Sequence, residues 1–155
     1  MKTKTLVGTF LIIIGLCLII YYVQVILPQN EAKKLLTEAT LIYERGDKES
    51  ISQAISILTK IIARYPDTKT SVEAYYYMGQ CYEKLNLNRL AYLKYVYLIK
   101  NNRKDLSDDL YKNILARIAH INWLNNYNEE SAHQLLTLLN SSIDKGYRSK
   151  IYSEL

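Results

Sequence analysis

The chain has 155 residues and a formal net charge of +5, which allows one modest domain and an additional segment. All acidic residues, and all basic residues except Lys2 and Lys4, follow position 27, and no basic tract is dense enough to indicate nucleic-acid binding. The two cysteines, Cys17 and Cys81, lie far apart in segments of different character. They therefore predict no disulfide framework.

A long apolar run follows a short basic flank, residues 1–5. Residues 6–27, from Leu6 to Leu27, contain no charged side chain. Because an α-helix rises about 1.5 Å per residue, a helix over this run is long enough to cross the hydrocarbon core of a bilayer. Tyr21 and Tyr22 stand near its far end, where aromatic rings favour the headgroup region. We predict an uncleaved transmembrane signal anchor over residues 6–27.

Two other interpretations of this run stay open. A cleaved signal peptide has an apolar core of about 7–15 residues and a small-x-small cleavage site, whereas this run is longer and no Ala precedes Ala32. A lipoprotein would be acylated at Cys17, but the bulky Leu16 stands where a small residue is preferred. Because basic residues flank both ends almost equally, the short N-terminal flank decides the expected orientation. We expect a single-pass protein with its N-terminus inside and its remaining domain outside the cytoplasm, in a bacterium the periplasm.

The first helical unit covers residues 29–65. Apolar residues at helical spacing predict a helix that closes at Gly46 and Asp47, a C-terminal signal. Ser50 and Gln53 form a candidate capping box for the next helix. The second unit covers residues 66–102 and follows the same plan.

In that second unit, Thr70 and Glu73 form another candidate capping box. Asn86 stands in the turn between the two helices, where Asn tolerates a left-handed backbone. The landmarks of this unit are Tyr75, Met78, Gly79, Tyr82, Ala91, Tyr95 and Leu98. Their spacing resembles a tetratricopeptide repeat (TPR), with an aromatic, a Leu-like residue, Gly and Tyr in the first helix and a small, an aromatic and an apolar residue in the second.

A degenerate third unit covers residues 107–145. Ser107 is its predicted N-cap, and a second helix is predicted to start at Asn128. Residues 146–155 are too short for a fourth unit and are predicted to form a C-terminal capping segment. The expected fold is all-α: a transmembrane helix, then a repeat domain, residues 28–145, that forms an α-solenoid of about three TPR-like helical hairpins.

The resemblance implies where the helices meet and which residues they present to a partner. Gly79 is expected to be small because two helices approach there, and Tyr77, Tyr92 and Tyr97 are expected to cover the convex side. The first helices would line a concave protein-binding groove. The side chains expected in it are Leu36, Thr40, Tyr43, Tyr76, Gln80, Glu83 and His120. Of the positions that clamp a C-terminal carboxylate in some family members, only Asn113 and Arg117 keep suitable residues, so that mode is not expected.

The sequence shows no recognisable catalytic constellation. His120 and His133 have no Cys or carboxylate at a metal-ligand spacing, and no Gly-rich phosphate loop is present. We expect a non-enzyme without cofactor, metal, nucleic acid or small-molecule substrate. The resemblance implies a membrane-anchored scaffold or adaptor of the bacterial cell envelope that binds a peptide or helix of a protein partner. The alternative is a permanent structural subunit, possibly a lipoprotein, of an envelope assembly or secretion complex.

Overall fold

The protein is all-helical in the part that its computed structural model describes, residues 2–126 and 133. The second helix predicted from Asn128 and the capping segment 146–155 lie outside the described residues. The helices, in chain order, are α1 (Lys2–Tyr21), the π-helical turn η1 (Tyr22–Ile26), α2 (Leu27–Arg45), α3 (Lys48–Arg64), α4 (Lys69–Lys84), α5 (Asn88–Asn101), the short 3₁₀ turn η2 (Arg103–Asp105) and α6 (Asp108–Asn126).

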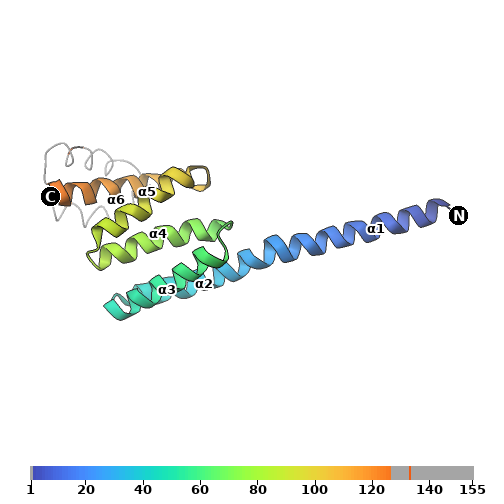
Figure 1. Ribbon diagram of the computed structural model, residues 1–155, viewed down its shortest axis with the longest axis horizontal. Coiled ribbons are helices and arrows are strands. Elements are labelled where there is room, and N and C mark those ends of the chain that lie inside the picture. Colours follow the sequence, from blue (N-terminus) through green and yellow to red (C-terminus); the bar gives the residue numbers. More distant parts are fainter. Residues whose placement is uncertain (1, 127–132, 134–155) are drawn as a thin grey trace.

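The first three elements form one uninterrupted rod that projects far beyond the other helices (Figure 1). Tyr21, Ile26 and Leu27 all keep right-handed helical backbone angles. Proline removes a backbone donor and crowds the carbonyl four residues earlier, which for Pro28 belongs to Gln24 inside the π-helical turn. The helix accommodates this proline without a break by widening locally into the π-helical turn. In that turn the Leu27 amide donates to the Tyr22 carbonyl, five residues earlier. The predicted boundary between anchor and domain therefore falls inside a continuous helix.

The apolar part of this rod stands clear of the other helices. From Ile12 onward it is long and apolar enough to cross a membrane, and none of its apolar window is buried inside the protein. Ile12, Leu18 and Ile19 are each more than half exposed. In water such a surface would be strongly unfavourable, which agrees with the prediction of a membrane-spanning segment at this end of the chain.

The turn between α2 and α3 confirms one predicted signal and corrects another. Gly46 ends α2 with a φ of 81°, a left-handed conformation that glycine adopts without steric cost. The N-cap of α3 is Asp47, whose carboxylate accepts hydrogen bonds from the Ser50 amide at 2.9 Å and the Ser50 hydroxyl at 2.6 Å. The predicted capping box at Ser50 and Gln53 is therefore wrong, because α3 begins three residues earlier.

The second hairpin shows the same shift at its start. Thr68, rather than Thr70, is the N-cap of α4, and its hydroxyl accepts from the Ser71 amide at 3.2 Å. Thr70 is instead buried and accepts a hydrogen bond from Gln29 at 2.9 Å. Between α4 and α5, Asn86 has a φ of 58°, which confirms its predicted left-handed backbone. At α6 the Ser107 hydroxyl accepts from the Leu110 amide at 3.2 Å, as predicted for an N-cap.

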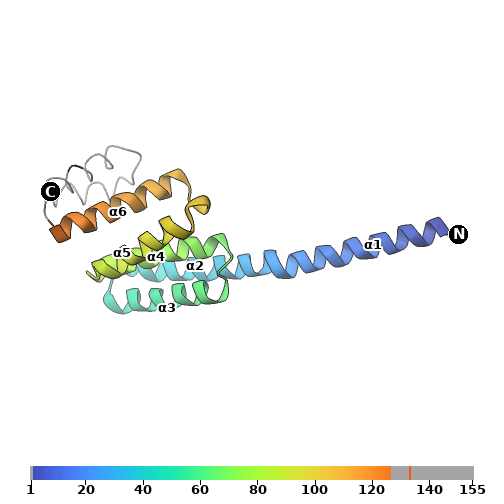
Figure 2. The ribbon, with the colours of Figure 1, turned by 45° about the horizontal axis from the view of Figure 1, so that its top comes forward.

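From α2 to α6 the helices run in alternating directions, and each packs against the next (Figure 2). Helix α2 also packs against α4. One core cluster joins α2, α3 and α4 around Leu36, Leu58 and Met78, and a second joins α4, α5 and α6 around Tyr95 and Ile114. Each such buried side chain contributes about 1.5–3 kcal/mol of hydrophobic stabilisation. Because α4 contributes residues to both clusters, it links the hairpin of α2 and α3 to the hairpin of α4 and α5.

Helices α4 and α5 are in close contact at Gly79. A Cβ added there would lie 2.7 Å from Cζ of Tyr95 and 3.0 Å from its Cδ1. Tyr95 is fully buried, and its pKa is raised well above the usual value, mainly because burial disfavours the charged phenolate. The predicted need for a small residue at Gly79 is confirmed: the Tyr95 ring occupies the space that a side chain would need.

Candidate functional site

Side chains from α2, α4 and α6 meet along one side of the stacked helices. We call this set the tyrosine–arginine face; it consists of Tyr43 on α2, Tyr76, Tyr77, Glu83 and Lys84 on α4, and Arg117 on α6.

The aromatic half of the face is a chain of three tyrosines. The Tyr43 and Tyr77 rings meet edge to face with centroids 6.2 Å apart, and the Tyr77 and Tyr76 rings follow at 5.9 Å. Both distances suit favourable aromatic pairing. Lys84 Nζ lies 3.7 Å from the centroid of the Tyr43 ring and donates to the Tyr43 carbonyl at 3.3 Å. Burial raises the pKa of Tyr43 to about 12, so this phenol is neutral at physiological pH.

The charged half is centred on an ion pair between α4 and α6. Nη1 of Arg117 lies 3.0 Å from both carboxylate oxygens of Glu83. The Tyr95 hydroxyl donates to the same carboxylate, and Nε of Arg117 donates to the Tyr76 hydroxyl at 3.3 Å. The Glu83 side chain is 9% exposed and that of Arg117 is 13% exposed. The pair therefore interacts in a partly desolvated environment, where electrostatic attraction exceeds that between exposed groups.

Three of the predicted groove residues lie in this face, namely Tyr43, Tyr76 and Glu83. Glu83 was expected to be offered to a partner, but it is bound within the protein by Arg117 and Tyr95. Gln80 is half-buried one turn before Glu83. Thr40 is also half-buried, and its hydroxyl donates to the Thr37 carbonyl at 2.9 Å.

Two predicted groove residues are core residues instead, which corrects that part of the prediction. Leu36 is 7% exposed and belongs to the core cluster of α2, α3 and α4. The physical reason is that α2 packs against both α3 and α4, so less of its circumference is free than a simple groove requires. His120 is 2% exposed, and its ring stacks on Trp123 with centroids 6.0 Å apart.

Sequence reasoning missed three residues of the face. Tyr77 was expected on the convex side, but its ring packs between those of Tyr43 and Tyr76. Lys84 and Arg117 were not placed in the groove. A signal was present in the spacing: Glu83 and Arg117 are 34 positions apart, about one repeat period of the resembled family. Tyr43 and Lys84, like Tyr76 and Arg117, are 41 positions apart.

The face offers aromatic rings, phenol hydroxyls and one ion pair. Within residues 2–126 and 133, no group of three or more His, Cys, Asp or Glu side chains could hold a metal ion. Cys81 lies on the buried side of α4, and burial raises its pKa to about 12, so its nucleophilic thiolate is suppressed. Comparisons with known protein families, with curated proteins and with solved structures found no match. The assignment of function therefore depends on the geometry alone.

Proposed function

We propose that this protein is a membrane-anchored scaffold or adaptor that binds a protein partner through its tyrosine–arginine face. The observation that carries this proposal is the convergence of Tyr43, Tyr76 and Tyr77 with Arg117 from three separate helices. Tyrosine and arginine are enriched among the residues that dominate binding energies at protein interfaces. Because these side chains are already held by one another, they lose little conformational entropy when a peptide or helix binds.

The fold that we propose for this scaffold is an α-solenoid of TPR-like hairpins. Its support is the order of packing, in which each helix contacts its neighbour and α2 also contacts α4. Contacts between side chains recur at separations of 34 and 41 residues, as in the pairs Glu31–Tyr65 and Gln29–Thr70. Stacked repeats of this kind present one extended surface made from their first helices, which here are α2, α4 and α6.

For location, we propose that α1 is the membrane anchor, with the N-terminus inside and the helical domain outside the cytoplasm, in a bacterium the periplasm. The exposed apolar surface from Ile12 to Ile20 supports the anchor, and the short basic N-terminal flank supports the orientation. Protease accessibility of the domain in right-side-out vesicles tests it. If the domain is digested only after the vesicles are opened, the orientation is reversed.

The binding proposal is tested by site-specific photo-crosslinking in intact membranes. A photoreactive residue at Gln80, beside the face, is expected to capture a defined partner, and Tyr43→Ala and Tyr76→Ala are each expected to reduce that capture strongly. Tyr92→Ala is the matched control, because Tyr92 is also half-buried but lies on α5. Circular dichroism confirms that each variant is folded. Equal capture by all folded variants would show that the face is not the binding surface.

A permanent structural subunit is the second candidate, and a different surface favours it. Leu87, Leu90, Leu93 and Tyr97 at or on α5 are each more than 40% exposed, and Leu90, Leu93 and Tyr97 have the spacing of one helix face. Such an apolar stripe suits a stable interface. This candidate predicts a stoichiometric complex after purification, whereas the adaptor predicts an isolable, stable protein. Its lipoprotein form further predicts acylation of Cys17, which intact-protein mass spectrometry detects.

A further inference from the structure

A cavity of about 650 Å³ lies where the projecting helix meets the helical domain. One wall comes from the helix around Gln24, Val25 and Gln29. The opposite wall comes from the end of α3 and the turn that leads into α4, and includes Arg64, Tyr65 and Lys69. We call this space the exit cavity.

The two walls of the exit cavity are fixed to each other by hydrogen bonds. Gln29 Nε2 donates to the Thr70 hydroxyl at 2.9 Å, and the Tyr65 hydroxyl donates to Glu31 at 2.6 Å. The helix that leaves the membrane is thus held against both α3 and α4. The cavity is a built feature of this junction, because α3, α4 and the rod cannot separate without breaking these contacts.

The position of the exit cavity along the rod sets its depth in a bilayer. The uncharged run ends at Leu27, so residues 24–29 lie at the boundary between hydrocarbon and headgroups if α1 spans the membrane as proposed above. Tyr21 and Tyr22, which favour that boundary, are exposed just before the cavity. The Arg64 and Lys69 side chains are therefore at the level of the lipid phosphates.

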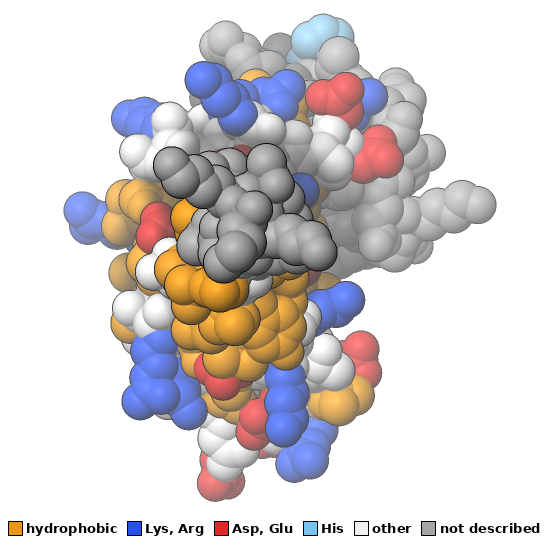
Figure 3. All heavy atoms as spheres, turned by 90° about the vertical axis from the view of Figure 1, so that its right-hand side faces the viewer, with side chains coloured by type: hydrophobic (Ala, Val, Ile, Leu, Met, Phe, Trp, Pro, Cys, Tyr) orange, Lys and Arg blue, Asp and Glu red, His pale blue; other side chains and the backbone are white. Residues whose placement is uncertain are grey.

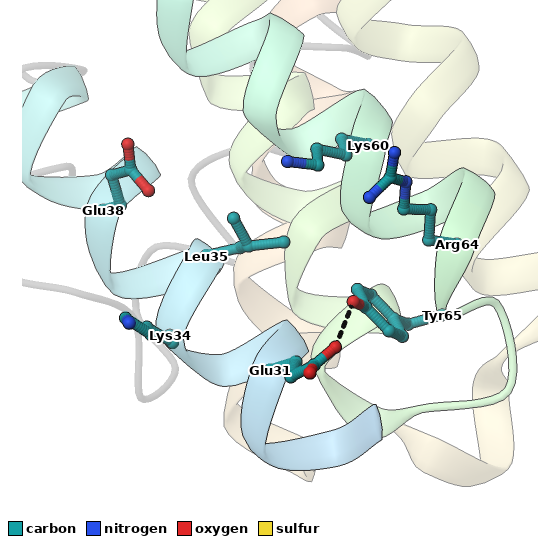
Figure 4. Close-up of a pocket in the computed structure, with 7 residues that line it drawn as sticks. All are labelled: Glu31, Lys34, Leu35, Glu38, Lys60, Arg64 and Tyr65. Carbon is teal, nitrogen blue, oxygen red and sulfur yellow. Dashed lines mark hydrogen bonds between the residues drawn. The ribbon is translucent and has the colours of Figure 1, made fainter. Parts of the chain in front are cut away.

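Cations outnumber anions around the exit cavity. Among its lining residues Arg64 and Lys69 are opposed by a single carboxylate, Asp67. An adjoining space of about 350 Å³ shares Arg64 and Tyr65 and is also lined by Lys34 and Lys60 and by the carboxylates of Glu31 and Glu38. There Lys60 and Arg64 extend from α3 toward α2 (Figure 4). Viewed along the rod, Lys and Arg side chains appear on several sides of the central apolar helix (Figure 3).

We propose that the exit cavity binds the phosphate of an anionic phospholipid headgroup, with Arg64 and Lys69 as its cationic ligands. The lipid's acyl chains lie along the apolar surface of the rod below Val25. This inference rests on the proposed membrane anchor but is independent of the protein partner. Arginine provides planar, paired donors for phosphate oxygens and lysine a point charge, and each cation close to an anionic membrane surface strengthens binding by about fivefold.

The test uses the full chain in nanodiscs that contain equimolar phosphatidylcholine and phosphatidylglycerol, with the lipids retained by the protein counted by native mass spectrometry. The wild-type protein is expected to retain phosphatidylglycerol preferentially. The double variant R64Q/K69Q is expected to lose this preference by roughly tenfold or more. The matched control is R45Q/K48Q, which removes one Arg and one Lys from exposed positions at the α2–α3 turn, the opposite end of that hairpin (Figure 1).

The outcomes separate this site from the proposed function. Unchanged selectivity in R64Q/K69Q, or an equal loss in the control, overturns the exit-cavity site while the anchor and the partner-binding face stand. Failure of the wild-type chain to enter nanodiscs overturns both the anchor and the site. Soluble glycerol 3-phosphate is added in a second arm to phosphatidylcholine nanodiscs, where no binding is expected. Binding of this compound that is lost in R64Q/K69Q would identify a site for a free phosphate and would overturn the lipid assignment.

Discussion

The substitution Gly79→Ala tests the close contact between α4 and the Tyr95 ring of α5. The added Cβ would lie 2.7 Å from Cζ of Tyr95, well inside van der Waals contact. The ring has little freedom to move, because Tyr95 is fully buried and its hydroxyl donates to Glu83. Overpacking of this kind costs about 1–3 kcal/mol, whereas alanine gains about 1 kcal/mol over glycine in a helix interior.

The steric cost should exceed the gain in helix propensity. We expect Gly79→Ala to lower the free energy of unfolding by about 1–2 kcal/mol and Tm by roughly 5 °C, measured by circular dichroism of the full chain in detergent. In a Tyr95→Leu background the obstructing ring is gone, and the same substitution should become neutral or stabilising. A higher Tm for Gly79→Ala in the otherwise wild-type chain would refute the close packing of α4 against α5.

Three further predictions concern charge and ionisation. Arg117→Met leaves Glu83 buried without its cation and should lower the free energy of unfolding, measured with denaturant, by about 3 kcal/mol. Arg103→Met, which removes an exposed pair with Asp108 at 3.6 Å, should lower it by less than about 1 kcal/mol. Equal losses in the two variants would contradict the burial of the Arg117–Glu83 pair. The hydrogen bonds that the Ser50 hydroxyl and amide donate to Asp47 lower the pKa of this carboxylate below its usual 3.8. The stabilisation by this cap is therefore fully present above the unfolded-state pKa and is lost as pH falls through the lower pKa of the folded protein. The Tm difference between wild type and Asp47→Ala should accordingly shrink in acid; a constant difference would count against the cap. Cys81, fully buried with a pKa raised to about 12, should resist maleimide in a Cys17→Ser background until the domain unfolds, and rapid labelling of the folded chain would show that α4 is not packed as described.

The sequence predicted those features that a backbone or steric requirement fixes locally. Gly46 and Asn86 stand where the chain adopts positive φ, and few residue types tolerate that conformation. Gly79 is small because a neighbouring ring fills the space of its side chain. Each of these requirements restricts one position to very few amino acids, so it can be recognised without knowledge of the surrounding packing.

The starts of α3 and α4 were misassigned because each contains two suitable side-chain oxygens two or three residues apart. At α3 the choice lay between Asp47 and Ser50, and in both hairpins the cap lies upstream of the predicted one. Sequence pattern alone does not show which oxygen meets the free amides, since that depends on where the preceding turn ends. The burial of Leu36 and His120 was missed for a related reason: helical periodicity identifies an apolar face, but not how many neighbours cover it.

The uninterrupted rod from Lys2 to Arg45 has a mechanical consequence. Because the helix passes through Pro28 without a hinge and continues into the core at Ala32, the domain cannot rotate freely about α1, the proposed membrane anchor. A rotation of the anchor about its own axis turns the tyrosine–arginine face through the same angle. If two copies associated through these helices, their tyrosine–arginine faces would therefore be held at a fixed relative orientation.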